Sequence, residues 1–73
     1  MATLPVLSGR DVVRALSKDG WQVARQRGSH IILVKDGSHA TLSVPDHKEV
    51  AKGTLRGLLR ASGLTVEQFL ALL

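Results

Sequence analysis

The chain has 73 residues and no cysteine, which predicts one small domain, residues 1–73, without disulfides, a thiol nucleophile or a cysteine-based zinc site. No run approaches the roughly 18 apolar residues that span a bilayer, and the N-terminus lacks signal-peptide features, so we expect a cytoplasmic protein. Ten Lys and Arg against six Asp and Glu give a net charge of +4. That excess favours an anionic partner such as nucleic acid, although it also suits an ordinary soluble domain.

The first predicted element is a helix over residues 9–18. Ser8 is its expected N-cap, and Asp11 completes a short form of the capping box. Apolar residues at helical spacing predict a buried stripe of Val12, Val13, Ala15 and Leu16. Cations recur on another face at positions 10, 14 and 18, which suits either a solvated surface or a ridge for phosphates.

Three strands are predicted next. Residues 21–25 alternate large and polar side chains like a half-buried strand, residues 30–35 are aliphatic, and residues 40–44 alternate until Pro45 ends the third strand. Gly28 and Ser29 supply a tight connection between the first two strands. Asp36-Gly37 predicts a type I′ turn between the second and third. The expected product is an antiparallel meander.

Two helices complete the chain after a polar loop over residues 46–51. The first starts at residue 52 or 53, continues to residue 62 and buries Leu55, Leu58 and Leu59. We expect Gly63 to end it in the left-handed conformation, and Thr65 with Gln68 to cap a short last helix.

This order, α-β-β-β-α with an additional short C-terminal helix, predicts an α+β fold. A three-stranded antiparallel sheet is covered by helices on one face and open on the other. Ile32 and Val34 alternate with Ile31 and Leu33, so one pair faces away from the helices. An uncovered aliphatic pair indicates a protein partner or self-association, unless it reflects strand propensity alone.

His30, beside the Gly28-Ser29 connection, is the candidate for chemistry. Imidazole is the one side chain whose ordinary pKa lies near physiological pH, and Arg25 and Arg27 can bring positive charge to a phosphate there. Lys52 combines an ammonium group with the free N–H groups of a helix N-terminus. These residues suit metal-free cleavage of RNA, but a plain strand-end histidine remains the alternative.

Other enzyme arrangements are missing from the sequence. There is no phosphate-binding loop and no HExxH pair, and the spacing of His30, His39 and His47 matches no metal-ligand motif. Ser29 and His30 do not form a hydrolase pair, because adjacent strand residues point to opposite faces. We expect no metal and no cofactor.

Five segments, at residues 4–9, 25–30, 44–47, 52–56 and 63–70, make the chain resemble the HicA (YcfA-like) toxins of type II toxin–antitoxin pairs. The resemblance implies a fold like the double-stranded-RNA-binding domain. It also implies an endoribonuclease that cleaves mRNA without a cofactor and is neutralised by a HicB-type antitoxin. The catalytic histidine of that family follows Gly-Ser, which is His30 here. Asp46 stands where many relatives carry an apolar or neutral residue, and the sequence indicates no chemical consequence.

The resulting prediction has His30 as catalytic residue and RNA contacts by Arg25, Arg27, Ser29, Lys48 and Lys52. His47 suits a loop cap or phosphate contact better than a second catalyst. The expected partners are mRNA and the HicB-type antitoxin. An oligomer formed through the toxin–antitoxin complex is compatible with this prediction. Two other functions stay open: a non-catalytic RNA-binding module that uses the basic helices, and a protein-interaction adaptor that uses the aliphatic sheet face.

Overall fold

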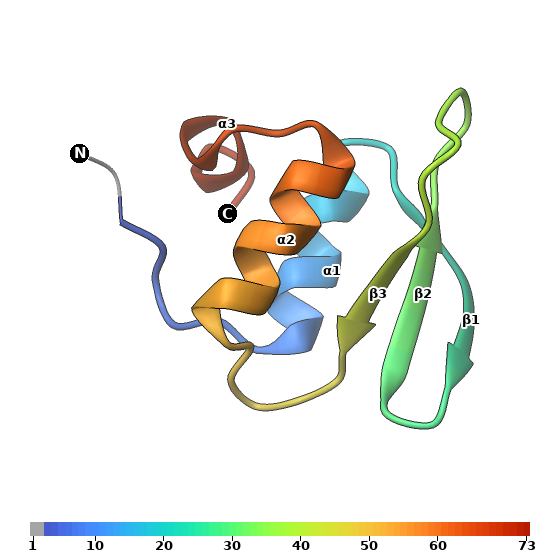
Figure 1. Ribbon diagram of the computed structural model, residues 1–73, viewed down its shortest axis with the longest axis horizontal. Coiled ribbons are helices and arrows are strands. Elements are labelled where there is room, and N and C mark those ends of the chain that lie inside the picture. The colour runs from blue at the N-terminus through green and yellow to red at the C-terminus, as the bar shows by residue number, and fades with distance from the viewer. Residues whose placement is uncertain (1–2) are drawn as a thin grey trace.

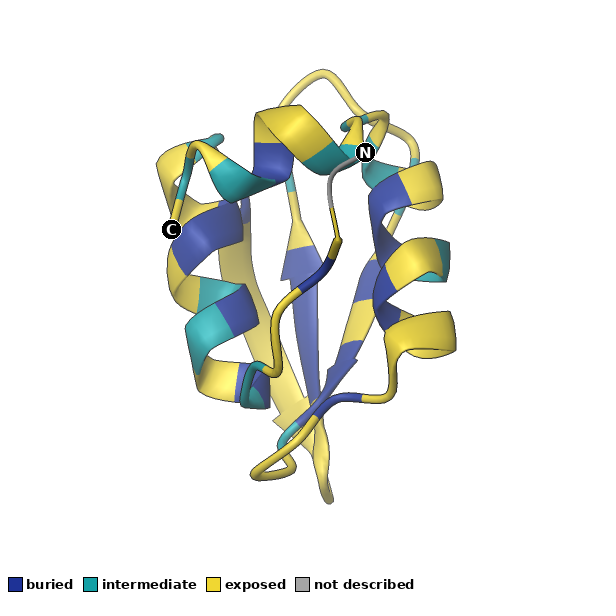
Figure 2. Ribbon diagram, turned by 90° about the vertical axis from the view of Figure 1, so that its left-hand side faces the viewer, coloured by how far each residue is buried: buried dark blue, intermediate teal, exposed yellow. Residues whose placement is uncertain are grey.

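The computed structural model describes residues 3–73. The elements follow the order α1 (Gly9–Lys18), β1 (Gln22–Arg27), β2 (His30–Val34), β3 (Leu42–Pro45), α2 (Lys52–Ser62) and α3 (Val66–Leu70). The strands form one antiparallel sheet in the order β1-β2-β3. Both long helices lie on the same side of this sheet (Figures 1 and 2). The predicted α+β architecture, like that of a double-stranded-RNA-binding domain, is confirmed.

The core lies between the helices and the sheet, where buried residues gather (Figure 2). Its fully buried side chains come from all three helices, from β2 and β3 and from the residue before β1: Val12, Leu16, Trp21, Leu33, Leu42, Val44, Leu55 and Phe69. Burying each such side chain is worth about 1.5–3 kcal/mol relative to leaving it exposed. Phe69 carries α3 into this core, so the short last helix is held by packing.

The predicted helix ends are confirmed. The Ser8 hydroxyl accepts from the Asp11 N–H at 3.1 Å, and the Ser8 N–H donates to the Asp11 carboxylate at 3.2 Å. That backbone hydrogen bond is the main reason why the pKa of Asp11 is lowered. Gly63 ends α2 at φ 79°, with the Leu64 N–H donating to the Leu59 carbonyl at 3.1 Å, and a capping box begins α3.

The first strand differs from the prediction. β1 runs over Gln22–Arg27, beyond the predicted residue 25, and all six of its residues are exposed, so it is not half-buried. Trp21, immediately before it, is buried instead. The physical reason is the strand's place at the sheet edge, since the helices pack mainly on β3 at the other edge.

The connection between β2 and β3 also differs. Gly37 has φ 82°, but no non-glycine residue in the described chain has positive φ, so Asp36-Gly37 is not a type I′ turn, which needs two. Pairing starts only at Leu33 and Leu42, and residues 35–41 form a longer loop. Register follows the buried pattern, which places Leu42 and Val44 opposite Leu33 and Ile31 and leaves the loop residues 35–41 unpaired.

The aliphatic pair on the open face is only partly uncovered. Val34 is 39% exposed, but Ile32 is only 8% exposed even though it lies outside the main core cluster. Ile32 sits in the central strand, paired with Arg25 on β1 and Ser43 on β3, so neighbours shield it on both sides. Within residues 3–73, no helix combines the length and the apolar character needed to cross a membrane.

Candidate nucleic-acid cleavage site

His30 is the first residue of β2, and its side chain lies on the open face of the sheet. Ile31 and Leu33 belong to the core, so the alternation of strand side chains sends His30 and Ile32 the other way. His30 is exposed. An imidazole at this position is accessible to a large substrate, whereas a histidine beneath the helices would not be.

The register of β1 brings the two arginines to the same face as His30. Arg27 pairs with His30 and Arg25 pairs with Ile32. A β-bulge between Val23 and Arg25 makes this arrangement, because the extra residue reverses the alternation and leaves Val23 opposite Leu33. Arg25 and Arg27 are both exposed. The face therefore presents two guanidinium groups beside one imidazole.

A hollow of about 340 Å³ on this face is lined by Arg27, His30, Ile32 and Ser43. Ser43 was missing from the predicted site. Its signal was present in the sequence, since it alternates with the buried Leu42 and Val44 and so has to lie on the open face. The hollow combines an acid–base group, a cation and a hydroxyl above an apolar floor.

The other predicted contact residues lie around this hollow and do not line it. Ser29 is exposed in the β1–β2 turn, while Lys48 lies in the β3–α2 loop and Lys52 is the first residue of α2. The turn, the loop and the start of α2 lie at one end of the molecule, with α2 on the helix side of the sheet (Figure 1). An extended ligand is needed to reach them and His30 together.

The predicted cations are not neutralised within the described chain. Ion pairs in residues 3–73 involve Arg10, Arg14 and Lys35, and none involves Arg25, Arg27, Lys48 or Lys52. Their charge is therefore available to an external anion such as a phosphate chain. Over the same residues, no group of three His, Asp or Glu side chains is close enough to hold a metal ion.

The remaining histidines are separated by the fold. His39 lies in the β2–β3 loop, at the end of the molecule away from the β1–β2 turn (Figure 1). His47 lies in the β3–α2 loop, where its carbonyl accepts from the Gly9 N–H at 2.9 Å and its side chain is exposed. His30 and His47 thus share one end, but only His30 lines the hollow.

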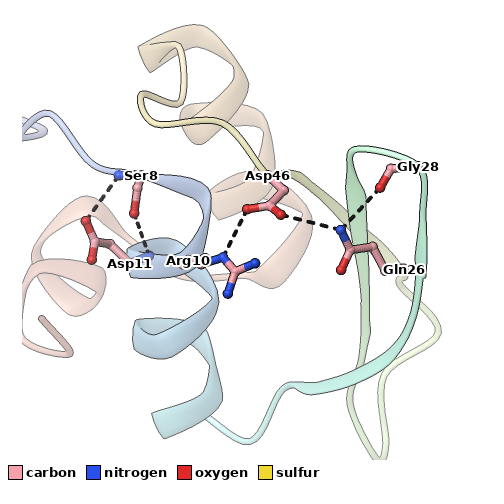
Figure 3. A network of polar contacts seen from close by, with 6 residues as sticks. All are labelled: Ser8, Arg10, Asp11, Gln26, Gly28 and Asp46. Atoms are coloured by element: carbon pink, nitrogen blue, oxygen red, sulfur yellow. Dashed lines mark hydrogen bonds and ion pairs between the residues drawn. The ribbon is translucent and has the colours of Figure 1, made fainter.

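A polar network supports the turn before His30, and sequence reasoning missed it. Asp46 accepts from Arg10 Nε at 3.4 Å through Oδ1 and from Gln26 Nε2 at 3.4 Å through Oδ2, and Gln26 Nε2 also donates to the Gly28 carbonyl at 3.2 Å (Figure 3). These residues come from α1, β1 and the segment after β3. Nothing local in the sequence indicates that they meet.

A family model described as "HicA toxin of bacterial toxin-antitoxin" matches residues 9–64. The chain belongs to the HicA toxin family. The matched range extends from α1 to the residue after the Gly63 cap, so it includes His30, both arginines of β1 and both predicted lysines. No curated protein matches the chain. The chain is therefore the toxin member of a toxin–antitoxin pair, and its partner is an antitoxin.

Proposed function

We propose that this HicA toxin is an endoribonuclease that cleaves mRNA with His30 as its acid–base group and is neutralised by a HicB-type antitoxin. The observation that carries the proposal is the exposed imidazole of His30 in a hollow shared with Arg27, on a face without an acidic side chain paired to either arginine of β1. An mRNA substrate also makes the cytoplasm the place of action.

The chemistry follows from these groups without a cofactor. A base removes the proton from the ribose 2′-hydroxyl, the 2′-oxygen attacks the adjacent phosphorus, and an acid protonates the departing 5′-oxygen. His30 supplies one of these proton transfers, worth about 10²–10⁴ in rate. Arg27, and Arg25 two pairs further along, stabilise the negative charge that develops on the phosphoryl oxygens.

RNA binding extends beyond the hollow in this proposal. Ser29, Lys48 and Lys52 lie at the same end of the molecule as His30, so an RNA strand that crosses the open face reaches them around the sheet end. Lys52 adds its ammonium group to the free N–H groups of the first turn of α2. Recognition through phosphates and 2′-hydroxyls suits this distribution of charge.

A second function, a non-catalytic RNA-binding module, is favoured by one observation. The hollow is lined by a single acid–base group, whereas the reaction needs both a base and an acid. This alternative predicts salt-sensitive RNA binding without cleavage.

The two functions are separated by the ends of the RNA products. The purified toxin, incubated with single-stranded RNA in excess EDTA, is expected to produce 2′,3′-cyclic phosphate and 5′-hydroxyl ends. A matched oligonucleotide with one 2′-deoxy sugar at the cleaved position should resist cleavage there. RNA that is bound in a salt-sensitive way but keeps its original ends would establish the binding module instead.

A further inference from the structure

Asp46 lies directly after the strand that pairs with His30. Pro45, the last residue of β3, is the partner of His30 in the sheet, and the Asp46 N–H donates to the Ser29 carbonyl at 2.6 Å. The segment after β3 is therefore bonded to the residue just before His30. The sheet and this additional bond together place Asp46 beside the turn that carries the proposed catalytic group.

The Asp46 side chain ties the same turn to α1. Its Oδ2 accepts from Gln26 Nε2, which also holds the Gly28 carbonyl, and its Oδ1 accepts from Arg10 Nε (Figure 3). The side chain of Asp46 is 21% exposed, against 75% for Arg10, so the carboxylate is the more sheltered partner. The carboxylate thus links α1 to the β1 side of the turn, while the Asp46 N–H bonds to Ser29.

The turn needs such support. Gly28 has φ 57°, and Gly28, Ser29 and His30 are all exposed, so packing does not hold them. A catalytic group has to be held to within about 0.5 Å, because a displacement of about 1 Å can cost about 100-fold in rate. Hydrogen bonds from Asp46 and Gln26 supply the restraint that core packing supplies elsewhere.

We propose that Asp46 is a positioning residue, whose carboxylate acts through Gln26 to hold the β1–β2 turn in the conformation that orients His30 toward RNA. The inference rests on the proposed function for its catalytic consequence, but the restraint of the turn is a property of the free protein. Arg10 keeps the carboxylate partly neutralised, which limits its repulsion of an approaching phosphate.

The test compares Asp46→Ala with Asp36→Ala, a matched aspartate in the exposed β2–β3 loop. Asp46→Ala is expected to lower kcat for RNA cleavage by about 10- to 100-fold with KM changed less than about twofold, because the group is misplaced rather than removed. Hydrogen exchange of the amides at residues 28–30 should become faster. Asp36→Ala should leave kcat, KM and exchange at these amides unchanged.

A double-mutant cycle gives the proposal its specificity. Gln26→Ala should reproduce most of the loss, and combining it with Asp46→Ala should add little, because both remove the same restraint. If Asp46→Ala does not fold, Asp46→Asn, which keeps an oxygen acceptor, replaces it in the cycle and is expected to lose roughly threefold in kcat.

Two results would overturn the inference: wild-type kcat in the Asp46 variant, or losses from Asp46 and Gln26 that multiply. Its failure is distinguishable from failure of the proposed function. If the wild-type protein cleaves no RNA, exchange at residues 28–30 still decides whether Asp46 restrains the turn. Unchanged exchange in the variant contradicts the restraint whatever the activity.

Discussion

The connections at the two ends of β2, the β1–β2 turn and the β2–β3 loop, are held in different ways. At the first end, the Ser29 carbonyl accepts from the Asp46 N–H, and Gln26 links the Gly28 carbonyl to Asp46. At the second end, Lys35 Nζ donates to Asp19 Oδ2 at 3.1 Å, and the rest of the loop over residues 35–41 has only short-range bonds, from the Ser38 N–H to the Lys35 carbonyl and from the Ala40 N–H to the Ser38 hydroxyl.

The difference separates an end whose turn is bonded to the segment after β3 from an end whose loop is bonded mainly to itself. The first end gathers segments that lie up to 36 residues apart, from Arg10 to Asp46, and carries His30. The second end carries His39, and beyond Lys35 the hydrogen bonds of its loop stay within the loop. A reaction site requires fixed geometry, so the proposed chemistry belongs to the first end.

The strongest test of this contrast is an insertion at each end. Two glycines after Ser29 should lower RNA cleavage by about 100-fold or more, because they detach His30 from the bonds at Ser29 and Gly28. Two glycines after Gly37 should leave cleavage unchanged and cost less than about 1 kcal/mol in the free energy of unfolding. Cleavage rates and urea denaturation measure both, and equal losses at the two ends would remove the distinction.

The next largest effect is on stability, and it tests how closely α1 approaches the residues that follow β3. A Cβ on Gly9 would meet the Pro45 carbonyl and lie 3.1 Å from the Asp46 Cα. Gly9→Ala should therefore lower the free energy of unfolding by about 1–3 kcal/mol. Gly57→Ala in α2, where a Cβ meets nothing within 4 Å, should raise it by roughly 0.5–1 kcal/mol. If thermal unfolding is the same for both, the approach of α1 to Pro45 is not tight.

A smaller effect concerns charge. Arg27→Gln should reduce the slope of log K for binding of single-stranded RNA against log salt by about 0.7, because one phosphate contact is lost. Lys18→Gln, at the end of α1 near the second end, removes the same charge and should leave the slope unchanged. Fluorescence anisotropy over a salt series measures both. Equal changes would show that only net charge matters.

The smallest predicted effect is on pH dependence. The pKa of Asp11 is lowered in the folded protein by the Ser8 hydrogen bonds, so the ionised carboxylate stabilises the fold above the unfolded pKa of about 3.9. This contribution is lost as pH falls through the lower folded pKa. Wild type should therefore lose slightly more stability than Asp11→Asn on acidification from about pH 5. If the Tm of wild type and that of Asp11→Asn fall in parallel as the pH is lowered, the Ser8–Asp11 capping box does not stabilise the fold in this way.

Local signals in the sequence predicted the helices well. Ser8 with Asp11, Thr65 with Gln68, and Gly63 each act within about six residues of chain, so a helix end can be identified without the fold. Strand alternation likewise separated Ile31 and Leu33 from Ile32 and Val34. It could not say which pair the helices cover, nor that flanking strands shield Ile32.

Features that depend on pairing between distant segments could not be predicted. The bulge that puts Arg25 and Arg27 on the face opposite to Val23 is set by register with β2, and the length of the β2–β3 loop is set by where Leu42 meets Leu33. Asp46 had no apparent role in the sequence because its partners, Arg10 and Gln26, lie 36 and 20 residues away. His30 was predicted from its local motif, and its place beside Arg27 in the hollow supports its proposed role.

The measurement that tests the central claim most directly compares two exposed histidines, one at each end of β2. RNA cleavage by His30→Ala and His39→Ala is followed at equal protein concentration, with circular dichroism as the control for folding. We predict that His30→Ala loses at least about 100-fold in rate with an unchanged spectrum, while His39→Ala cleaves like wild type. Cleavage by His30→Ala at the wild-type rate would contradict the account.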